Sequence, residues 1–182
     1  TYPPLENTWS YPDLRKSIMY NGELYVGGRL EVPNSSPPIY GLVKWDGSQW
    51  QKVGSGFNNQ NTFIYNMALF QNKLYAIGNF SISSGSPGNC IAKWDGTSWS
   101  QCGSGLVGNV FALKEYNGYL YVGGIFQSAS GGNIQSLAKW DGSQWYPVPG
   151  GTFANSASTA SFSVGNNDLY ICGYFDSISN TL

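Results

Sequence analysis

Three aspartates recur in one short motif and are the first candidates for chemistry. Asp46, Asp95 and Asp141 each stand in Lys-Trp-Asp-Gly, and a second tryptophan follows four residues after each of them. Carboxylates repeated in this way could bind a cation or act as acids. The glycine that follows each one favours a tight turn, in which an aspartate side chain caps backbone amides. We therefore predict that all three aspartates are structural turn residues.

The other ionisable residues form no catalytic pattern. The chain has ten Asp and Glu, nine Lys and Arg, and no histidine. A copper oxidase site would need histidine ligands, and three cysteines without a Cys-x-x-Cys motif make no zinc pattern. We expect no catalytic residue, no metal ligand and no cofactor.

Two of the cysteines flank the second motif. Cys90 and Cys102 would lie close to opposite each other on two paired strands. Two interpretations stay open: a disulfide across the strands, or two small apolar side chains that fill a core. With Cys172 the count is odd, which is not a disulfide framework.

Composition narrows the class of protein. Charged residues make up 10% of the chain and the net charge is −1, which gives no basic footprint for nucleic acid or for an anionic membrane. The chain has no run of about 18 apolar residues, so we expect no membrane insertion. Aromatic residues reach 16%, which is typical of a folded chain.

Turn motifs and short apolar runs alternate with a long period. Asn21-Gly22 and its counterparts predict one hairpin per unit, and the Trp-Asp-Gly motif predicts a second, so each unit has four strands. The first tryptophan recurs after 49 and 46 residues, a period typical of propeller blades. The predicted elements are an outer strand at about 5–11, blades at about 15–54, 62–104 and 109–149, and a half blade at about 160–178.

The repeated unit resembles a Kelch repeat, within the galactose-oxidase-like propellers. The resemblance rests on a strand ending in Gly-Gly, a variable loop and a Trp-bearing last strand. The pair is intact at Gly27-Gly28 and Gly123-Gly124 but reads Ile77-Gly78 and Cys172-Gly173 in the other units. The closest form is the Leu-Tyr-Val-Gly-Gly…Lys-Trp-Asp-Gly repeat common in large secreted or surface proteins of bacteria. The resemblance implies an all-β propeller of four-stranded antiparallel blades and an extracellular or cell-surface location.

The number of predicted strands bears on completeness. One outer strand, three blades and a trailing pair give about fifteen strands, whereas propellers typically close with four to eight whole blades. We therefore expect this chain to be a segment of a longer propeller.

A propeller of such blades is a disc with two different faces. In a four-stranded meander, the turns at Asn21-Gly22 and Asp46-Gly47 fall on one face, and the long loops at 29–40, 79–89 and 125–136 fall on the other. The connections at 54–62, 103–109 and 149–159 join this loop face. Variable polar loops on a repeated scaffold commonly carry binding, although solvated linkers would look the same. The candidate binding residues are Arg29, Asn34, Asn58, Asn59, Asn61, Asn109, Gln127 and Asn133.

These features favour a non-enzymatic binding or interaction module of a secreted or cell-surface protein. Its expected partner is a protein or a glycan, or other subunits of a surface assembly. One alternative is a glycan-active enzyme of the propeller type, with Lys16, Lys114 and Glu115 at a central channel. The other is an architectural subunit of a surface or secretion assembly.

Overall fold

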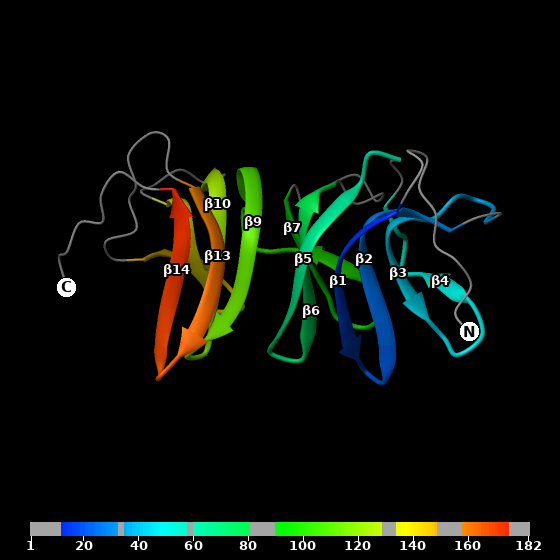
Figure 1. Ribbon diagram of the computed structural model, residues 1–182, viewed down its shortest axis with the longest axis horizontal. Helices are drawn as coiled ribbons and strands as arrows, with labels where there is room; N and C mark the ends of the chain where they lie inside the picture. The colour runs from blue at the N-terminus through cyan, green and yellow to red at the C-terminus, as the bar shows by residue number, and fades with distance from the viewer. Residues whose placement is uncertain are drawn as a thin grey trace.

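The computed structural model describes residues 12–32, 35–57, 60–80, 90–128, 134–148 and 158–174. All helix-or-strand structure in these residues is β-strand (Figure 1), so the predicted all-β class is confirmed. This part of the chain accordingly holds no apolar helix of membrane-spanning length. The predicted outer strand at 5–11 lies outside the described residues.

Three four-stranded antiparallel sheets follow one another along the chain, and in each the spatial order of the strands is their chain order. The first sheet comprises β1 (Asp13–Tyr20), β2 (Glu23–Glu31), β3 (Tyr40–Trp45) and β4 (Trp50–Lys52). The second comprises β5 (Phe63–Phe70), β6 (Lys73–Asn79), β7 (Ile91–Trp94) and β8 (Trp99–Gln101). The third comprises β9 (Leu106–Tyr116), β10 (Tyr119–Ser128), β11 (Gln135–Trp140) and β12 (Trp145–Pro147). A last hairpin pairs β13 (Ser158–Gly165) with β14 (Asp168–Tyr174).

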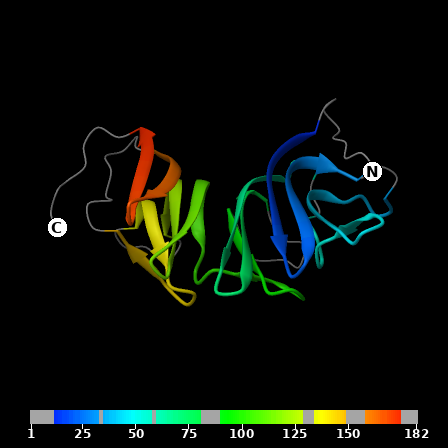
Figure 2. The same ribbon diagram turned by 60° about the horizontal axis from the view of Figure 1, so that its bottom comes forward.

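The sheets stand side by side in an open row (Figures 1 and 2), with β1–β4 at one end and β13–β14 at the other. The first strand of each sheet contacts the first strand of the next, from β1 through β5 and β9 to β13. The described sheets do not close into a ring.

Two kinds of turn lie at the same end of the strands, which we call the turn end. The hairpins between first and second strands turn through left-handed residues such as Asn21 (φ 50°) and Gly22 (φ 80°), as a tight two-residue turn requires. The side-chain amide of Gln71, in the second of these hairpins, donates to the carbonyl of Asp141 in the third Trp-Asp-Gly turn at 2.8 Å. The opposite end, where second strands lead toward third strands, is the loop end.

The recurrent aspartates hold the Trp-Asp-Gly turns. In each, the Oδ1 atom accepts hydrogen bonds from the backbone N–H groups two and three residues later, at 2.7 to 2.9 Å. These backbone bonds stabilise the carboxylate and lower the pKa of Asp46 and Asp95 well below the usual range. The same cause lowers the pKa of Asp141 to about 2. These carboxylates are therefore ionised at neutral pH and engaged by their own turns.

Aromatic residues join neighbouring sheets. The indole N–H of Trp99 donates to the Val53 carbonyl at 3.0 Å, and that of Trp145 donates to the Cys102 carbonyl at 2.8 Å, so β8 and β12 are each bonded to the sheet before them. The Tyr75 side chain is fully buried, and its hydroxyl accepts the Trp140 indole N–H at 3.2 Å. Burial raises the pKa of Tyr75 to about 12. The core therefore lies between sheets, and burying each such side chain contributes on the order of 1.5–3 kcal/mol.

The cysteines are all free thiols. Cys102 is buried in the core between the second and third sheets. The Cys90 thiol donates to the carbonyl of Gly108 in β9 of the next sheet, and the Cys90 side chain packs against the same core cluster. Of the two interpretations left open by the sequence, the structure shows the small core side chains and not the disulfide.

Candidate functional site

A β-bulge recurs in the first hairpin of every sheet. In the first sheet Leu14 pairs with Gly28 and Lys16 pairs with Gly27, which leaves Arg15 as an extra residue in β1. The equivalent extra residues are Tyr65 in β5, Phe111 in β9 and Ala160 in β13. Bulges bend a strand and redirect a side chain, and they are common next to binding sites.

The second glycine of the Gly-Gly motif makes this bulge. A Cβ atom on Gly28, Gly78 or Gly124 would lie 2.0 to 2.2 Å from a backbone carbonyl oxygen of the bulged strand. A Cβ on Gly27 would instead meet the Ile64 side chain of the next sheet at 2.7 Å. Because this neighbour is a side chain and not backbone, another repeat can make room with a different residue there. This explains why the first glycine is replaced in two units, by Ile77 and Cys172, whereas the second is kept in all four.

The bulges bring a row of arginine and aromatic side chains together toward the loop end of the first strands. The Arg15 and Arg29 guanidinium carbons lie 5.0 and 4.8 Å from the centre of the Phe63 ring. The Phe63 ring centre is 4.8 Å from that of Tyr65, which is in turn 6.0 Å from that of Phe111. We call these five residues the arginine–aromatic row.

The members of the row differ in what they leave accessible. Phe63 is buried, with both guanidinium groups against it, whereas Tyr65 and Phe111 are half-buried and keep part of each ring exposed. Arg15 forms an ion pair with Asp13 at 2.8 Å. Arg29 has no carboxylate within ion-pair distance in the described part of the chain. Its five N–H donors suit planar oxygen-rich groups.

The structure places four of the predicted binding residues. Arg29 belongs to the row, and Asn61 and Asn109 are exposed and stand two residues before Phe63 and Phe111. Gln127 is exposed on β10. The others, Asn34, Asn58, Asn59 and Asn133, lie outside the described residues.

The predicted loop boundaries were wrong at several of these positions. Arg29 lies in β2, Asn109 in β9 and Gln127 in β10, so these three are strand residues. The first hairpin of a sheet continues past its glycine pair because strand pairing resumes beyond the bulge. In the third sheet, for example, Val107 pairs with Gln127. Sequence reasoning also missed Arg15, Phe63, Tyr65 and Phe111 as site residues; the kept second glycine was the available signal.

The residues considered for an enzyme do not gather in one place. Lys16, Lys114 and Glu115 are all exposed on first strands. Lys114 and Glu115 are adjacent in β9, so their side chains leave opposite faces of the strand. Within the described ranges no three His, Cys, Asp or Glu side chains are grouped so as to hold a metal ion.

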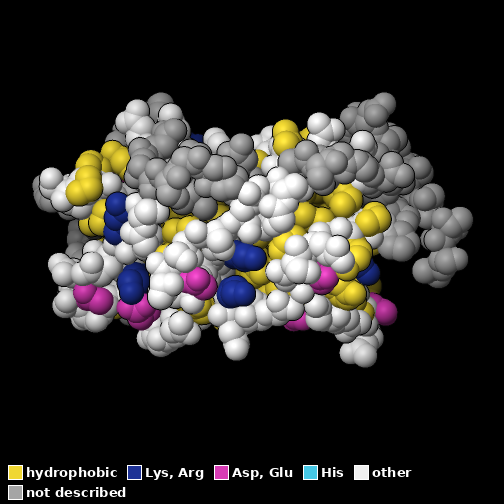
Figure 3. All heavy atoms as spheres, turned by 180° about the vertical axis from the view of Figure 1, so that it is seen from behind, with side chains coloured by type: hydrophobic (Ala, Val, Ile, Leu, Met, Phe, Trp, Pro, Cys, Tyr) yellow, Lys and Arg dark blue, Asp and Glu magenta, His cyan; other side chains and the backbone are white. Residues whose placement is uncertain are grey.

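Charged side chains of both signs are mixed on one face of the molecule. Figure 3 shows one face, on which Lys and Arg side chains alternate with Asp and Glu among mostly uncharged groups.

Searches against protein-family models and curated proteins find no match to this sequence.

Proposed function

We propose that this chain is part of a Kelch-like β-propeller and acts as a non-enzymatic binding module of a secreted or cell-surface protein. Three observations support the propeller: the four-stranded meander sheets, their adjacent first strands, and the repeated bonds from last-strand tryptophans to the preceding sheet. In such an arrangement the first strands line a central channel. The arginine–aromatic row then lies on the channel wall near the loop end.

The ligand that this row suits best is a glycan. Sugars present an apolar C–H face that packs on aromatic rings, and hydroxyl or carboxylate oxygens that accept hydrogen bonds. The half-buried rings of Tyr65 and Phe111 supply the first contact, and the guanidinium of Arg29 supplies the second. The row itself is the observation that carries this proposal. A protein ligand at the same place is the alternative outcome.

Binding of defined oligosaccharides, neutral and uronic-acid-containing, to the chain tests the proposal. We expect Arg29→Gln and Tyr65→Ala each to weaken binding about tenfold, which corresponds to about 1.4 kcal/mol. Asp95→Asn, at the turn end, is the matched control and should leave affinity unchanged. Urea unfolding of each variant shows whether weaker binding comes from a lost ligand contact or from a less stable fold.

The opposite pattern would refute the proposal: affinity that survives both row variants and falls with Asp95→Asn. Binding of a protein from the native source, sensitive to the row variants and without any glycan binding, would support the alternative ligand.

An architectural role has one observation in its favour. The last hairpin exposes large apolar side chains, since Val164, Tyr170 and Tyr174 are 42%, 49% and 66% exposed. The equivalents of Tyr170 in the first two sheets, Tyr25 and Tyr75, are buried in core clusters shared with the sheet that follows. Concentration-dependent oligomers in sedimentation velocity, abolished by Tyr170→Ser, would favour this second function.

A further inference from the structure

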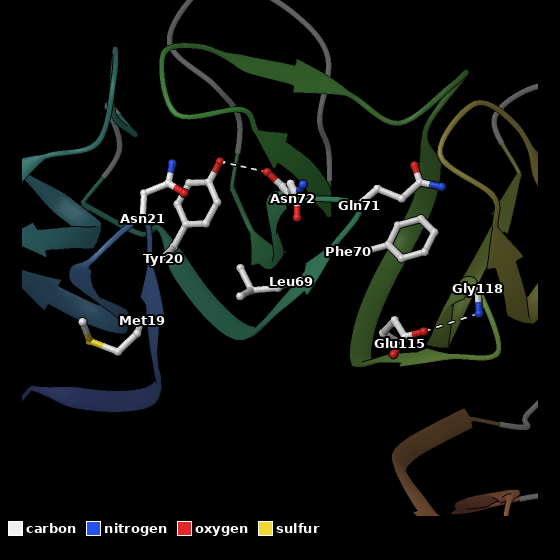
Figure 4. Close-up of a pocket in the computed structure, with 9 residues that line it drawn as sticks. All are labelled: Met19, Tyr20, Asn21, Leu69, Phe70, Gln71, Asn72, Glu115 and Gly118. Carbon is white, nitrogen blue, oxygen red and sulfur yellow. Dashed lines mark hydrogen bonds between the residues drawn. The ribbon is translucent and has the colours of Figure 1, made fainter.

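A hollow of about 540 Å³ opens at the turn end, across the first three sheets (Figure 4). It is lined by the ends of the first strands and by the hairpin turns that follow them. Met19, Leu69 and Glu115 are the second-last residues of β1, β5 and β9, so the repeat brings equivalent positions together across three sheets. This volume is within the range of about 300–1,000 Å³ common for ligand sites.

The frame of the hollow is bonded between sheets. The Tyr20 hydroxyl donates to the Asn72 carbonyl at 3.1 Å, which joins the first sheet to the second (Figure 4). Gln71 donates to the third sheet at Asp141, as described above. The turn residues Asn21, Gln71 and Asn72 hold left-handed φ angles of 50°, 48° and 55°. The hollow is therefore formed before any ligand arrives.

Its lining combines apolar surface with a negative charge. The Met19 and Leu69 side chains are 56% and 40% exposed, although both are large and hydrophobic. Among the described residues that line the hollow, Glu115 is the only charged one, and none is lysine or arginine. Its carboxylate accepts a long hydrogen bond of 3.4 Å from the Gly118 N–H, and no ion pair involves it in the described part of the chain.

This pattern complements a basic side chain. Lysine and arginine lay an aliphatic stem along apolar surface and keep the charged group at a polar site. Met19 and Leu69 offer the surface for the stem, and Glu115 offers the counter-charge. An anionic ligand, nucleic acid included, would be repelled by the Glu115 carboxylate and would find no lysine or arginine among the described residues that line the hollow.

We propose that the turn-end hollow is a docking site for a partner protein, which it holds by a lysine or arginine side chain seated along Met19 and Leu69 against Glu115. This site is at the opposite end of the strands from the arginine–aromatic row. It does not depend on glycan binding there.

Amide NMR of the ¹⁵N-labelled chain, titrated with the peptide acetyl-Gly-Lys-Lys-Gly-amide, tests the proposal. We expect saturable shifts centred on Asn21, Gly22, Asn72 and Gly118 at millimolar peptide. The same peptide with both lysines Nε-acetylated is the uncharged control and should give at least tenfold weaker binding.

Two variants locate the contact. Glu115→Gln should weaken binding about fivefold, as expected for one partly exposed ion pair. Glu31→Gln removes a carboxylate at the loop end and should change nothing. The proposal is overturned if peptide shifts fail to saturate, if they centre elsewhere, if the acetylated peptide binds equally well, or if Glu115→Gln binds like the wild type.

Discussion

The bulge glycine gives the sharpest test of how the repeat builds its site. In Gly124→Ala, the new Cβ would lie 2.1 Å from the Asn109 carbonyl oxygen, whereas ordinary contact begins at 3.4 Å. The neighbouring atoms, Val110 Cα at 2.9 Å and the Asn109 carbonyl carbon at 3.0 Å, are also backbone and cannot rotate aside. The bulge must open by about 1 Å, at a cost near the upper end of the 1–3 kcal/mol typical of overpacking.

Urea unfolding followed by tryptophan fluorescence measures this cost. With a slope of about 2 kcal/mol per molar urea, a loss of 2–3 kcal/mol lowers the midpoint by about 1–1.5 M. Because Phe111 is the bulge residue opposite Gly124, glycan binding should weaken as well. Gly165→Ala is the matched control: its nearest contact is Tyr170 at 3.5 Å and its φ is not left-handed, so stability should stay equal or rise by about 0.4–1 kcal/mol. Equal midpoints for the two variants would refute the steric account of the second glycine.

Three further predictions concern the core, the turns and the thiols. Tyr75→Phe leaves the Trp140 indole N–H unpaired in the core and should cost about 1–3 kcal/mol in urea unfolding, while Tyr170→Phe, at the exposed equivalent position, should be neutral. The turn aspartates have folded pKa values below the ordinary 3.8, so their stabilisation is complete above that value and is lost as pH falls through the folded pKa. The urea concentration at the unfolding midpoint should therefore decrease as the pH is lowered from 5 to 2, and it should decrease less in a variant with asparagine at all three positions. The same decrease in both proteins would contradict this. Burial raises the pKa of Cys102 to about 12, so under native conditions a disulfide-exchange reagent should label exposed Cys172 and spare Cys102, and unfolding without reductant should expose all three thiols.

The regular part of the fold could be predicted from the sequence because each signal in it is local. Asn21-Gly22 and the Trp-Asp-Gly motif specify tight turns through two or three residues, and two such hairpins per unit give four strands. The four-stranded antiparallel sheets follow directly, and they are present. The joining of one sheet to the next depends on residues far apart in the chain, such as Trp99 and Val53. No local pattern in a single sequence identifies that pair.

The candidate site was harder to predict because a bulge hides its residues. Polar loops were expected to carry binding, and Arg29 was included on that ground, yet it and two other candidates lie in strands. The extra residue shifts the alternation of inward and outward side chains by one, so Tyr65 and Phe111 read as ordinary core aromatics in the sequence. Only the pairing register shows that they occupy the same place as Arg15.

The register also suggests how one scaffold could serve different ligands. The second glycine fixes the backbone of the bulge, while the bulge residue itself is free to vary, as Arg15, Tyr65 and Phe111 do within one chain. At the turn end the second-last residue of each first strand varies in the same way, as methionine, leucine and glutamate. The bulge position and the second-last position of the first strand thus carry different side chains in different repeats. Exchanging Tyr65 for arginine should therefore alter ligand preference at the loop end without changing the urea midpoint by more than about 0.5 M, and a large loss of stability would show that the bulge side chain belongs to the core instead.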